Sequence, residues 1–278
     1  MVVGIVSPGA MGSAVGDALA RGGTRVVATI AGRSRRTARL AEAAAIELLP
    51  GLPAVVRESA IVLSVVPPGE APAVASTVAE IAARLGVRPL FVDLNAVAPQ
   101  TVRALETGLD LVDGSISGPP PRTAGTTRIY LSGPRASDVA GVPMPGVELV
   151  VVGAEIGAAS AVKMCTASVY KGQTAVLAHA LLTARANGVL EHVLADLGKL
   201  AEGKGTAVAR SVTKAHRYVD EMREIAATQE AAGLPRELFD GMAAAYEALA
   251  RRPLGSRAPE EIDPQLTIEA ALDALDQR

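Results

Sequence analysis

Short apolar runs of strand length alternate with helix-like stretches over the first 152 residues of the chain. Strands that are buried on both faces of a sheet read as continuous apolar runs, and helical connections between them make neighbouring strands parallel. We therefore predict a doubly wound, mostly parallel α/β sheet. The predicted strands are Val2–Val6, Arg25–Ile30, Ala60–Val66, Pro89–Leu94, Asp110–Ile116, Arg128–Leu131 and Val147–Val152.

After Gly153 this alternation ends, and Ala-rich helical sequence continues to the C-terminus. The stretch from Glu155 to about Ala186 contains no proline, so it predicts one unusually long helix that could join two domains. We therefore expect an α/β domain at 1–154 and an all-α domain at 155–278. The breaks expected between the later helices are Gly188, Gly203–Gly205, Gly233–Pro235 and Pro253–Pro264.

Charge and hydropathy exclude several classes of partner. The 27 Lys and Arg residues nearly balance 29 Asp and Glu residues, for a net charge of -2, so neither nucleic acid nor an anionic membrane surface is indicated. No apolar run reaches the ~20 residues of a membrane span, and no charged leader precedes the first strand. The single cysteine, Cys165, and the absence of metal-ligand spacing favour a cytoplasmic protein without a metal site.

The first strand runs directly into Ser7-Pro8-Gly9-Ala10-Met11-Gly12 and then a helix. This fits the last two glycines of G-x-G-x-x-G, the Rossmann dinucleotide fingerprint, with Ser7 in place of the first glycine. A glycine at position 9 lets the backbone approach a pyrophosphate, and the helix N-terminus stabilises its charge. We predict cofactor contacts from Ser7, Pro8, Gly9, Ala10 and Met11. The alternative is a strand-to-helix turn without a ligand.

The end of the second strand favours NADP over NAD. An NAD enzyme would place an acidic residue there for the ribose hydroxyl, whereas this chain has Arg33, Ser34, Arg35 and Arg36. Guanidinium groups bind a 2′-phosphate bidentately, and the Ser34 hydroxyl adds a donor. A solvated basic cluster at a helix start is the alternative.

Two further loops follow predicted strands, at the edge where doubly wound sheets bind ligands. Val66 and Pro67 follow the strand that begins at Ala60, and Asn95 follows the next strand. We expect these three residues to flank the ribose and nicotinamide of the cofactor. A proline-forced turn and an asparagine helix cap would explain the same residues structurally.

Three stretches along the chain are informative when taken together and in order. They are Gly9-Ala10-Met11-Gly12, Asp113-Gly114-Ser115-Ile116-Ser117-Gly118 and Gly157-Ala158-Ala159-Ser160-Ala161-Val162-Lys163-Met164. Together they resemble the 6-phosphogluconate / β-hydroxyacid dehydrogenase superfamily, and their order and spacing match along the whole chain. The continuation through Tyr170 and Lys171 is similar to a poorly characterised subgroup with a phosphogluconate-dehydrogenase-like C-terminal domain.

The resemblance implies that the Ser117 and Gly118 loop binds the substrate carboxylate and that Lys163 is the acid/base. The residues support the second role independently, because Lys163 is the lone cation of an apolar helical stretch, where burial penalises its charged form. Without the motif, a lysine whose ammonium reaches solvent from a buried helix is the alternative. Lys171, two turns further on, either binds an anionic substrate group or lies on the helix surface.

The chain also departs from this family. Many hydroxyacid dehydrogenases carry Asn four residues after the lysine, where this chain has Ala167, and the Ser-Gly loop continues into Pro119-Pro120-Pro121. The substrate of those relatives therefore cannot be transferred to this chain.

We predict an NADP-dependent oxidoreductase that acts on a small β-hydroxy acid or the corresponding aldehyde or ketone. Imine reduction is one alternative, although imine reductases usually have another residue at the position of Lys163. A non-catalytic NADP-binding or redox-sensing protein is another, since fold does not establish function. The Ala-rich helical half also predicts a homodimer.

Overall fold

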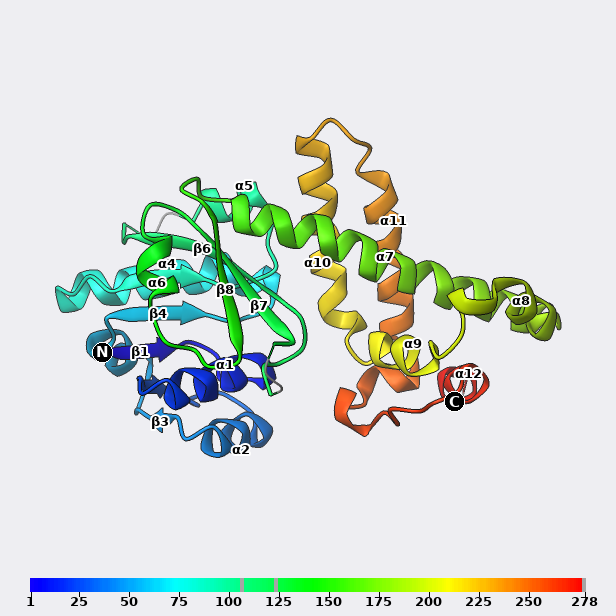
Figure 1. Cartoon of the computed structure of the whole chain (residues 1–278), viewed down its shortest axis with the longest axis horizontal. Helices are drawn as coiled ribbons and strands as arrows, with labels where there is room; N and C mark the ends of the chain where they lie inside the picture. Colours follow the sequence, from blue (N-terminus) through cyan, green and yellow to red (C-terminus); the bar gives the residue numbers. More distant parts are fainter. Residues whose placement is uncertain (106–107, 123–124, 277–278) are drawn as a thin grey trace. The chain divides into compact units, whose positions relative to one another are not determined.

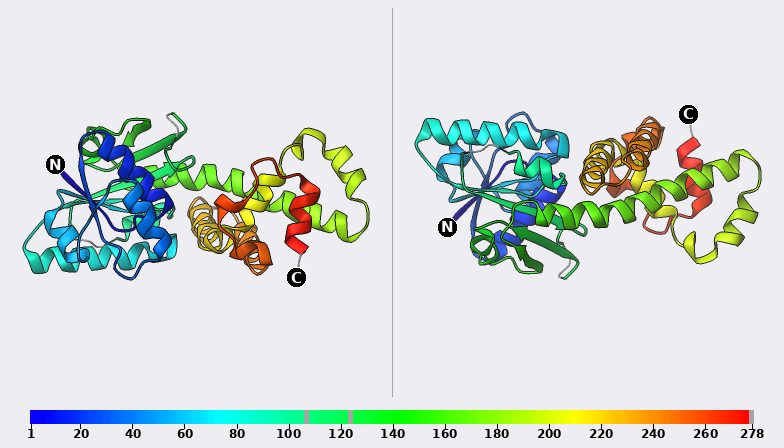
Figure 2. Two further views of the ribbon diagram at one scale, coloured as in Figure 1. Left: turned by 90° about the horizontal axis from the view of Figure 1, so that it is seen from below. Right: turned by 90° about the horizontal axis from the view of Figure 1, so that it is seen from above.

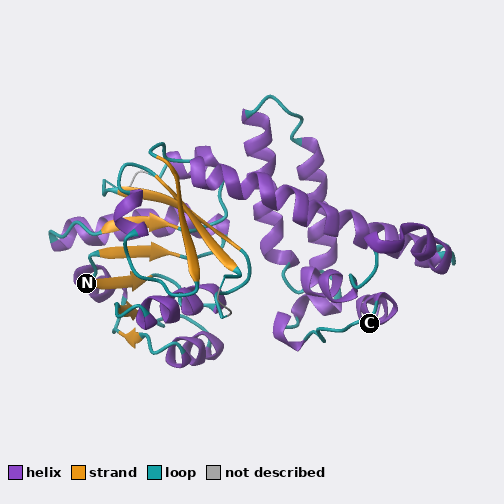
Figure 3. Ribbon diagram, in the orientation of Figure 1, coloured by secondary structure: helices purple, strands orange, loops and turns teal. Residues whose placement is uncertain are grey.

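The computed structural model describes residues 1–105, 108–122 and 125–276. These residues form two compact units, Met1–Met164 and Cys165–Arg278, which we call the sheet unit and the helical unit. Figure 3 shows strands in the sheet unit, whereas the described part of the helical unit consists of helices and their connections. This confirms the predicted fold class, a doubly wound α/β sheet followed by an all-α region.

The described part of the sheet unit contains one eight-stranded sheet with the order β3-β2-β1-β4-β5-β6-β7-β8 (Figure 1). β6 and β7 are antiparallel, and the other neighbouring strands are parallel. The order reverses between β1 and β4, and in such sheets ligands bind at the carboxyl ends of the strands beside this point. The strands are β1 (Val2–Ile5), β2 (Arg25–Ala28), β3 (Glu47–Leu48), β4 (Ile61–Ser64), β5 (Leu90–Asp93), β6 (Leu111–Ser117), β7 (Thr127–Ser132) and β8 (Val147–Gly153).

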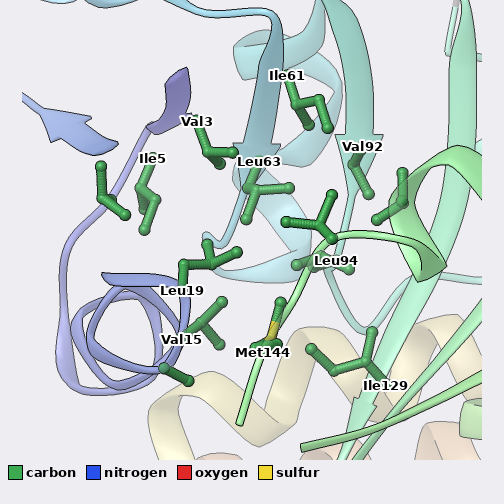
Figure 4. Packing of buried hydrophobic residues seen from close by; sticks show 14 of the residues in the cluster. Val3, Ile5, Val15, Leu19, Ile61, Leu63, Val92, Leu94, Ile129 and Met144 are labelled. Carbon is green, nitrogen blue, oxygen red and sulfur yellow. The ribbon is translucent and has the colours of Figure 1, made fainter. Parts of the chain in front are cut away.

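Each face of the sheet carries its own hydrophobic core, because successive strand residues point to opposite faces. Ile61 and Leu63 of β4 belong to one core with α1, α2 and α6, whereas Val62 belongs to the other with α3, α4 and α5. Figure 4 shows Val15 and Leu19 of α1 against the strands, and Figure 2 shows the layers from two further sides. The helices are α1 (Ala10–Arg21), α2 (Arg35–Ala43), α3 (Leu52–Glu58), α4 (Ala71–Leu85), α5 (Pro99–Arg103) and α6 (Ala136–Ala140).

All seven predicted strands are present in the sheet, although their ends differ by a few residues. The sequence analysis missed β3, because a strand of two residues at the sheet edge carries no periodic signal.

The predicted long helix is α7, which spans Ala158–Ala186. Its first turns belong to the sheet unit and the remainder to the helical unit, so the division lies inside the helix, after Met164. The later helices are α8 (Leu190–Leu197), α9 (Gly205–Val212), α10 (Ala215–Ala231), α11 (Glu237–Ala250) and α12 (Ile268–Asp276). α7, α10 and α11 end beside the predicted breaks at Gly188, Gly233 and Pro253, whereas α8 and α9 end at Leu197 and Val212, where the sequence analysis predicted no break.

Candidate functional site

The loop between β1 and α1 leaves the helix N-terminus open for an anion. Gly9 is the N-cap residue of α1, and the helix has no side-chain cap and no acidic residue in its first turn. A Cβ atom at Gly9 would meet nothing within 4 Å, whereas one at Gly12 would lie 2.1 Å from the Ser7 carbonyl oxygen. Backbone N–H groups of Ala10 and Met11 at this end can hold a pyrophosphate. The geometry therefore fits the dinucleotide loop expected from residues 7 to 12.

The arginine cluster lies at the start of α2. Ser34 caps this helix, since its hydroxyl oxygen accepts a hydrogen bond from the Thr37 N–H at 3.2 Å. Arg33 and Arg35 are exposed, Arg36 is half-buried, and the first turn of α2 has no acidic residue. The cluster can therefore attract a phosphate, although the Ser34 oxygen is already engaged in its own helix cap.

A pocket of about 300 Å³ lies in the sheet unit beside Arg33. It combines segments that follow β1 and β2 with residues from α3 and from the start of α4. Its volume is at the lower end for small-molecule sites and suits the adenosine part of a dinucleotide. The sequence analysis missed the contributions of α3 and α4, because only the fold brings them beside β2. The lining residues are Val6, Thr29, Ala31, Arg33, Leu52, Glu70, Ala73, Val74 and Thr77.

Asn95 joins the ends of β4 and β5. Its side-chain amide donates to the Ser64 hydroxyl at 2.9 Å and to the Asp93 carboxylate at 2.7 Å, and its Oδ1 accepts from the Val66 N–H at 2.6 Å. Asn95 is 3% exposed, whereas Val66 and Pro67 are half-buried. The buried amide therefore fixes the Val66–Pro67 loop at the ligand edge of the sheet.

Asp113 on β6 anchors the beginning of α7. The carboxylate is fully buried and accepts hydrogen bonds from the Ser132 hydroxyl at 2.8 Å and from the Gly157 N–H at 2.9 Å. The Ser160 N–H and hydroxyl also donate to it, at 3.1 Å and 2.6 Å. In addition, the Ser115 hydroxyl donates to the Ala159 carbonyl at 2.7 Å. These bonds set the first turns of α7 against β6.

Lys163, one turn further along α7, reaches the end of β6. Its Nζ is half-buried and donates a hydrogen bond to the Ile116 carbonyl oxygen at 2.9 Å. Ser117 and Gly118 follow Ile116 directly, and Gly118 has a φ of 110°, which favours glycine. The structure thus brings together Lys163 and the Ser-Gly turn, which lie far apart in the sequence.

Lys171 belongs to a buried polar cluster of the helical unit. It forms an ion pair with Glu221, and its Nζ lies 4.3 Å from the centre of the Tyr218 ring. The Tyr246 hydroxyl donates to the Lys171 carbonyl at 2.8 Å. Burial, assisted by Glu221, raises the pKa of Tyr218 to about 12, so this phenol stays neutral. Contacts between α7, α10 and α11 therefore account for Lys171, and its predicted substrate contact stays a prediction.

None of the helices in the described ranges combines the length and the apolar character that a membrane-spanning segment requires. The same residues contain no cluster of three or more His, Cys, Asp or Glu side chains that could hold a metal ion.

Family models match both parts of the chain. The Rossmann-like domain matches residues 1–93, and a domain of unknown function, DUF1932, matches residues 184–249. A curated relative, an uncharacterized 28.5 kDa protein of Methanothermus fervidus, is 27% identical over 207 residues, which are 70% of this chain and 78% of the relative.

Solved structures extend the similarity to nearly the whole chain. A conserved protein of unknown function, described as structurally similar to 3-hydroxyacid dehydrogenases, has 27% identity and a TM-score of 0.64, covering 90% of this chain and 97% of its own. A 3-hydroxyisobutyrate dehydrogenase from Mycobacterium tuberculosis, with L-serine, has 19% identity and a TM-score of 0.65, covering 99% of each chain.

An imine reductase from Myxococcus stipitatus, in complex with NADP⁺, has 19% identity and a TM-score of 0.55, covering 99% of this chain and 100% of its own. Because the identity to each of these two enzymes is 19%, the comparison with them shows a shared fold and no shared function. The chain therefore joins a Rossmann-like domain to a DUF1932 domain and has the architecture of the 6-phosphogluconate / β-hydroxyacid dehydrogenase superfamily, as its motifs indicated.

Proposed function

We propose that the protein is an NADP-dependent oxidoreductase that acts on a small β-hydroxy acid or the corresponding aldehyde or ketone. One observation carries the proposal: the Lys163 ammonium lies at the Ser117–Gly118 turn, in the same unit as the open N-terminus of α1. The Lys163 ammonium at this turn suits proton transfer beside a bound carboxylate. The open N-terminus of α1 suits the binding of a dinucleotide pyrophosphate.

Different residues of the chain would bind different parts of the cofactor. The first-turn amides of α1 would hold the pyrophosphate, and Arg33 with its neighbours would hold the 2′-phosphate. Asn95 would act indirectly, because its bond to Val66 positions the loop that faces the ligand. When bound, the nicotinamide ring supplies the hydride chemistry.

Lys163 would transfer the proton of the substrate hydroxyl. The bond from Nζ to the Ile116 carbonyl orients the amine at the end of β6, so the proton moves to or from a defined position. The Ser117 hydroxyl and the Gly118 N–H are donors that can bind the substrate carboxylate beside it. Proton and hydride would then leave the same CH–OH group, or reach the same C=O group.

Replacing Lys163 by methionine tests this role. We expect kcat to fall by about 10²- to 10⁴-fold, as for loss of a general acid/base, while the Kd of NADPH stays within about twofold of the wild-type value. The matched control is Lys204→Met, which removes an exposed lysine in the connection before α9. Unchanged kcat in Lys163→Met would refute the mechanism.

A substrate panel separates the proposed reaction from its alternatives. Small β-hydroxy acids, semialdehydes and cyclic imines are each incubated with NADP⁺ or NADPH, and nicotinamide absorbance is followed. We expect turnover with hydroxy acids or carbonyl compounds, because a lysine at this position suits oxygen chemistry. Turnover of imines alone would indicate an imine reductase, and cofactor binding without any turnover would indicate a sensor.

A further inference from the structure

The face of the sheet that carries Ser117 also carries an arginine that the proposed function has not used. β6 and β7 are antiparallel, and their register places Ser117 directly opposite Arg128. Side chains of two residues that face each other across antiparallel strands point to the same side of the sheet, with their Cβ atoms about 5 Å apart. Arg128 is therefore a neighbour of the Ser117 side chain at the proposed substrate turn.

Contacts of the two strands show which side of the sheet this is. Ile116 and Ile129, the next pair in the register, belong to the hydrophobic core with α1 and α6. Residues beside them in sequence point to the opposite face, where the Ser115 hydroxyl donates to the first turn of α7. Arg128 thus lies on the face that α7 covers at its start, and Lys163 of the same helix reaches the end of β6.

A residue of the next strand orients the Arg128 side chain. Glu148 of β8 lies opposite Arg128, and its carboxylate accepts a hydrogen bond from the Arg128 Nε at 2.5 Å. Hydrogen bonding to Glu148, and then to Tyr130, raises the pKa of Arg128, so the guanidinium stays charged. The guanidinium has further N–H donors on its two Nη atoms. Because the side chain is 57% exposed, these donors can meet an anion from solvent.

The charges of this pair favour one kind of anion. Glu148 offsets part of the positive charge of Arg128, so the pair suits a singly charged carboxylate better than a doubly charged phosphate. Arginine also matches the planar geometry of a carboxylate. A hydroxy acid whose first carboxylate binds at Ser117 and Gly118 would bring a second carboxylate to Arg128, because the two strand positions are about 5 Å apart.

We propose that Arg128 is a specificity-determining residue that binds a second carboxylate of the substrate, so that the protein prefers β-hydroxy dicarboxylic acids to β-hydroxy monocarboxylic acids. This inference rests on the proposed function, because it takes the turn at Ser117 and Gly118 as the site of the first carboxylate.

Two hydroxy acids that differ in the second acid group test the proposal. 3-Hydroxyglutarate carries this group, and 3-hydroxyvalerate has a methyl group in its place. Isothermal titration calorimetry measures the Kd of each acid for the protein saturated with NADPH, a complex in which a hydroxy acid cannot be oxidised. We expect the wild-type protein to bind 3-hydroxyglutarate about tenfold more tightly, the lower range for one charge-assisted hydrogen bond.

Substitutions at the two members of the ion pair should act in opposite directions. Arg128→Gln should bring the ratio of the two Kd values close to one. Glu148→Gln leaves the guanidinium charge without its carboxylate, so it should raise the preference for 3-hydroxyglutarate by about threefold. The matched control, Arg135→Gln, removes another exposed arginine with ion pairs on the sheet unit and should keep the wild-type ratio.

Several outcomes would overturn the inference and leave the proposed function standing. They are a wild-type ratio near one, an equal loss of affinity for both acids in Arg128→Gln, and the same effect in Arg128→Gln and Glu148→Gln. The last result would mean that the ion pair only stabilises the strands. If the wild-type protein bound no NADPH, or turned over no hydroxy acid or carbonyl compound, the proposed function would fail together with the inference.

Discussion

Asp113 and Lys163 are oppositely charged residues of the sheet unit, and their side chains lie in different surroundings. Four donors surround the buried Asp113 carboxylate, so its charge serves to hold the start of α7. Lys163 is half-buried and donates a hydrogen bond to the Ile116 carbonyl at the end of β6. Within the Asp-x-x-x-Ser-Gly loop, the aspartate is thus a structural residue, and Ser117 and Gly118 are left as the candidates for substrate contact.

Arg33 is the residue at which the choice of cofactor can be tested. We expect Arg33→Ala to weaken NADPH binding by about 10- to 100-fold, because a charge-assisted hydrogen bond to the 2′-phosphate is lost, and NADH binding by less than about threefold. Isothermal titration calorimetry with both cofactors measures the two values. Arg57→Ala, at an exposed position of α3 outside the pocket, should change neither. Equal weakening of both cofactors would refute the assignment of the phosphate to Arg33.

At the scale of elements, the β1–α1 connection contains two glycines, Gly9 and Gly12, whose surroundings differ. Gly12 has no space for a side chain because the Ser7 carbonyl lies too close, whereas Gly9 faces open space. Gly12 is thus required by packing between the turn and the helix, whereas no contact within the chain requires Gly9, the glycine that we propose a pyrophosphate approaches.

Two alanine substitutions test this difference between the glycines. Gly12→Ala should lower the free energy of unfolding by more than ~2 kcal/mol, because its methyl group must displace backbone. Gly9→Ala should keep the wild-type Tm and weaken NADPH binding at least tenfold, or ~1.4 kcal/mol, because its methyl group stands before the first-turn amides. Thermal unfolding and cofactor titration measure both. Full NADPH affinity in Gly9→Ala would contradict a pyrophosphate at this helix end.

The first turn of α7 depends on Asp113. We expect Asp113→Ala to lower the free energy of unfolding by about 3 kcal/mol, since buried donors of Ser132, Gly157 and Ser160 lose their acceptor. Urea denaturation monitored by circular dichroism measures this loss. Asp138→Ala, which removes an exposed ion pair with Arg135, should cost less than ~1 kcal/mol. Similar losses in both variants would contradict the anchoring role.

For the molecule as a whole, we propose that the helical unit makes a homodimer. Beyond the sheet unit, α7 exposes Val169 at 53%, Tyr170 at 71% and Val176 at 60%. Val169 and Val176 are seven residues apart, so they lie on one face of the helix and give it an apolar surface. A second copy of the same helical face would cover this surface by two-fold symmetry.

The double substitution Val169→Glu and Val176→Glu tests the assembly. Both residues are exposed, so we expect the fold and its circular dichroism to persist, while light scattering after gel filtration shows a change from dimer to monomer. Leu85→Glu, at the exposed end of α4, should leave the dimer intact. A wild-type monomer, or a double variant that remains dimeric, would refute this interface.

Much of the fold followed from local sequence, because strand and helix periodicities are properties of short segments. The runs from Val2 to Val152 predicted seven of the eight strands, and the glycine and proline breaks predicted where α7, α10 and α11 end, although not where α8 and α9 end. The helix N-terminus at Gly9 and the lysine of α7 were also visible, since each lies in a short motif with a physical reason.

Tertiary structure decided which distant residues meet. Only the pairing of β6 with the start of α7 places Lys163 at the Ile116 carbonyl, and only the layering of α4 over the sheet puts Glu70 in a pocket with Arg33. The pairing of Lys171 with Glu221 is of the same kind. Sequence spacing carries no information on such contacts, because they depend on how complete elements pack. The sequence therefore determined most of the elements and indicated the type of chemistry that we propose, whereas packing decided the partners of Asp113, Lys163 and Lys171.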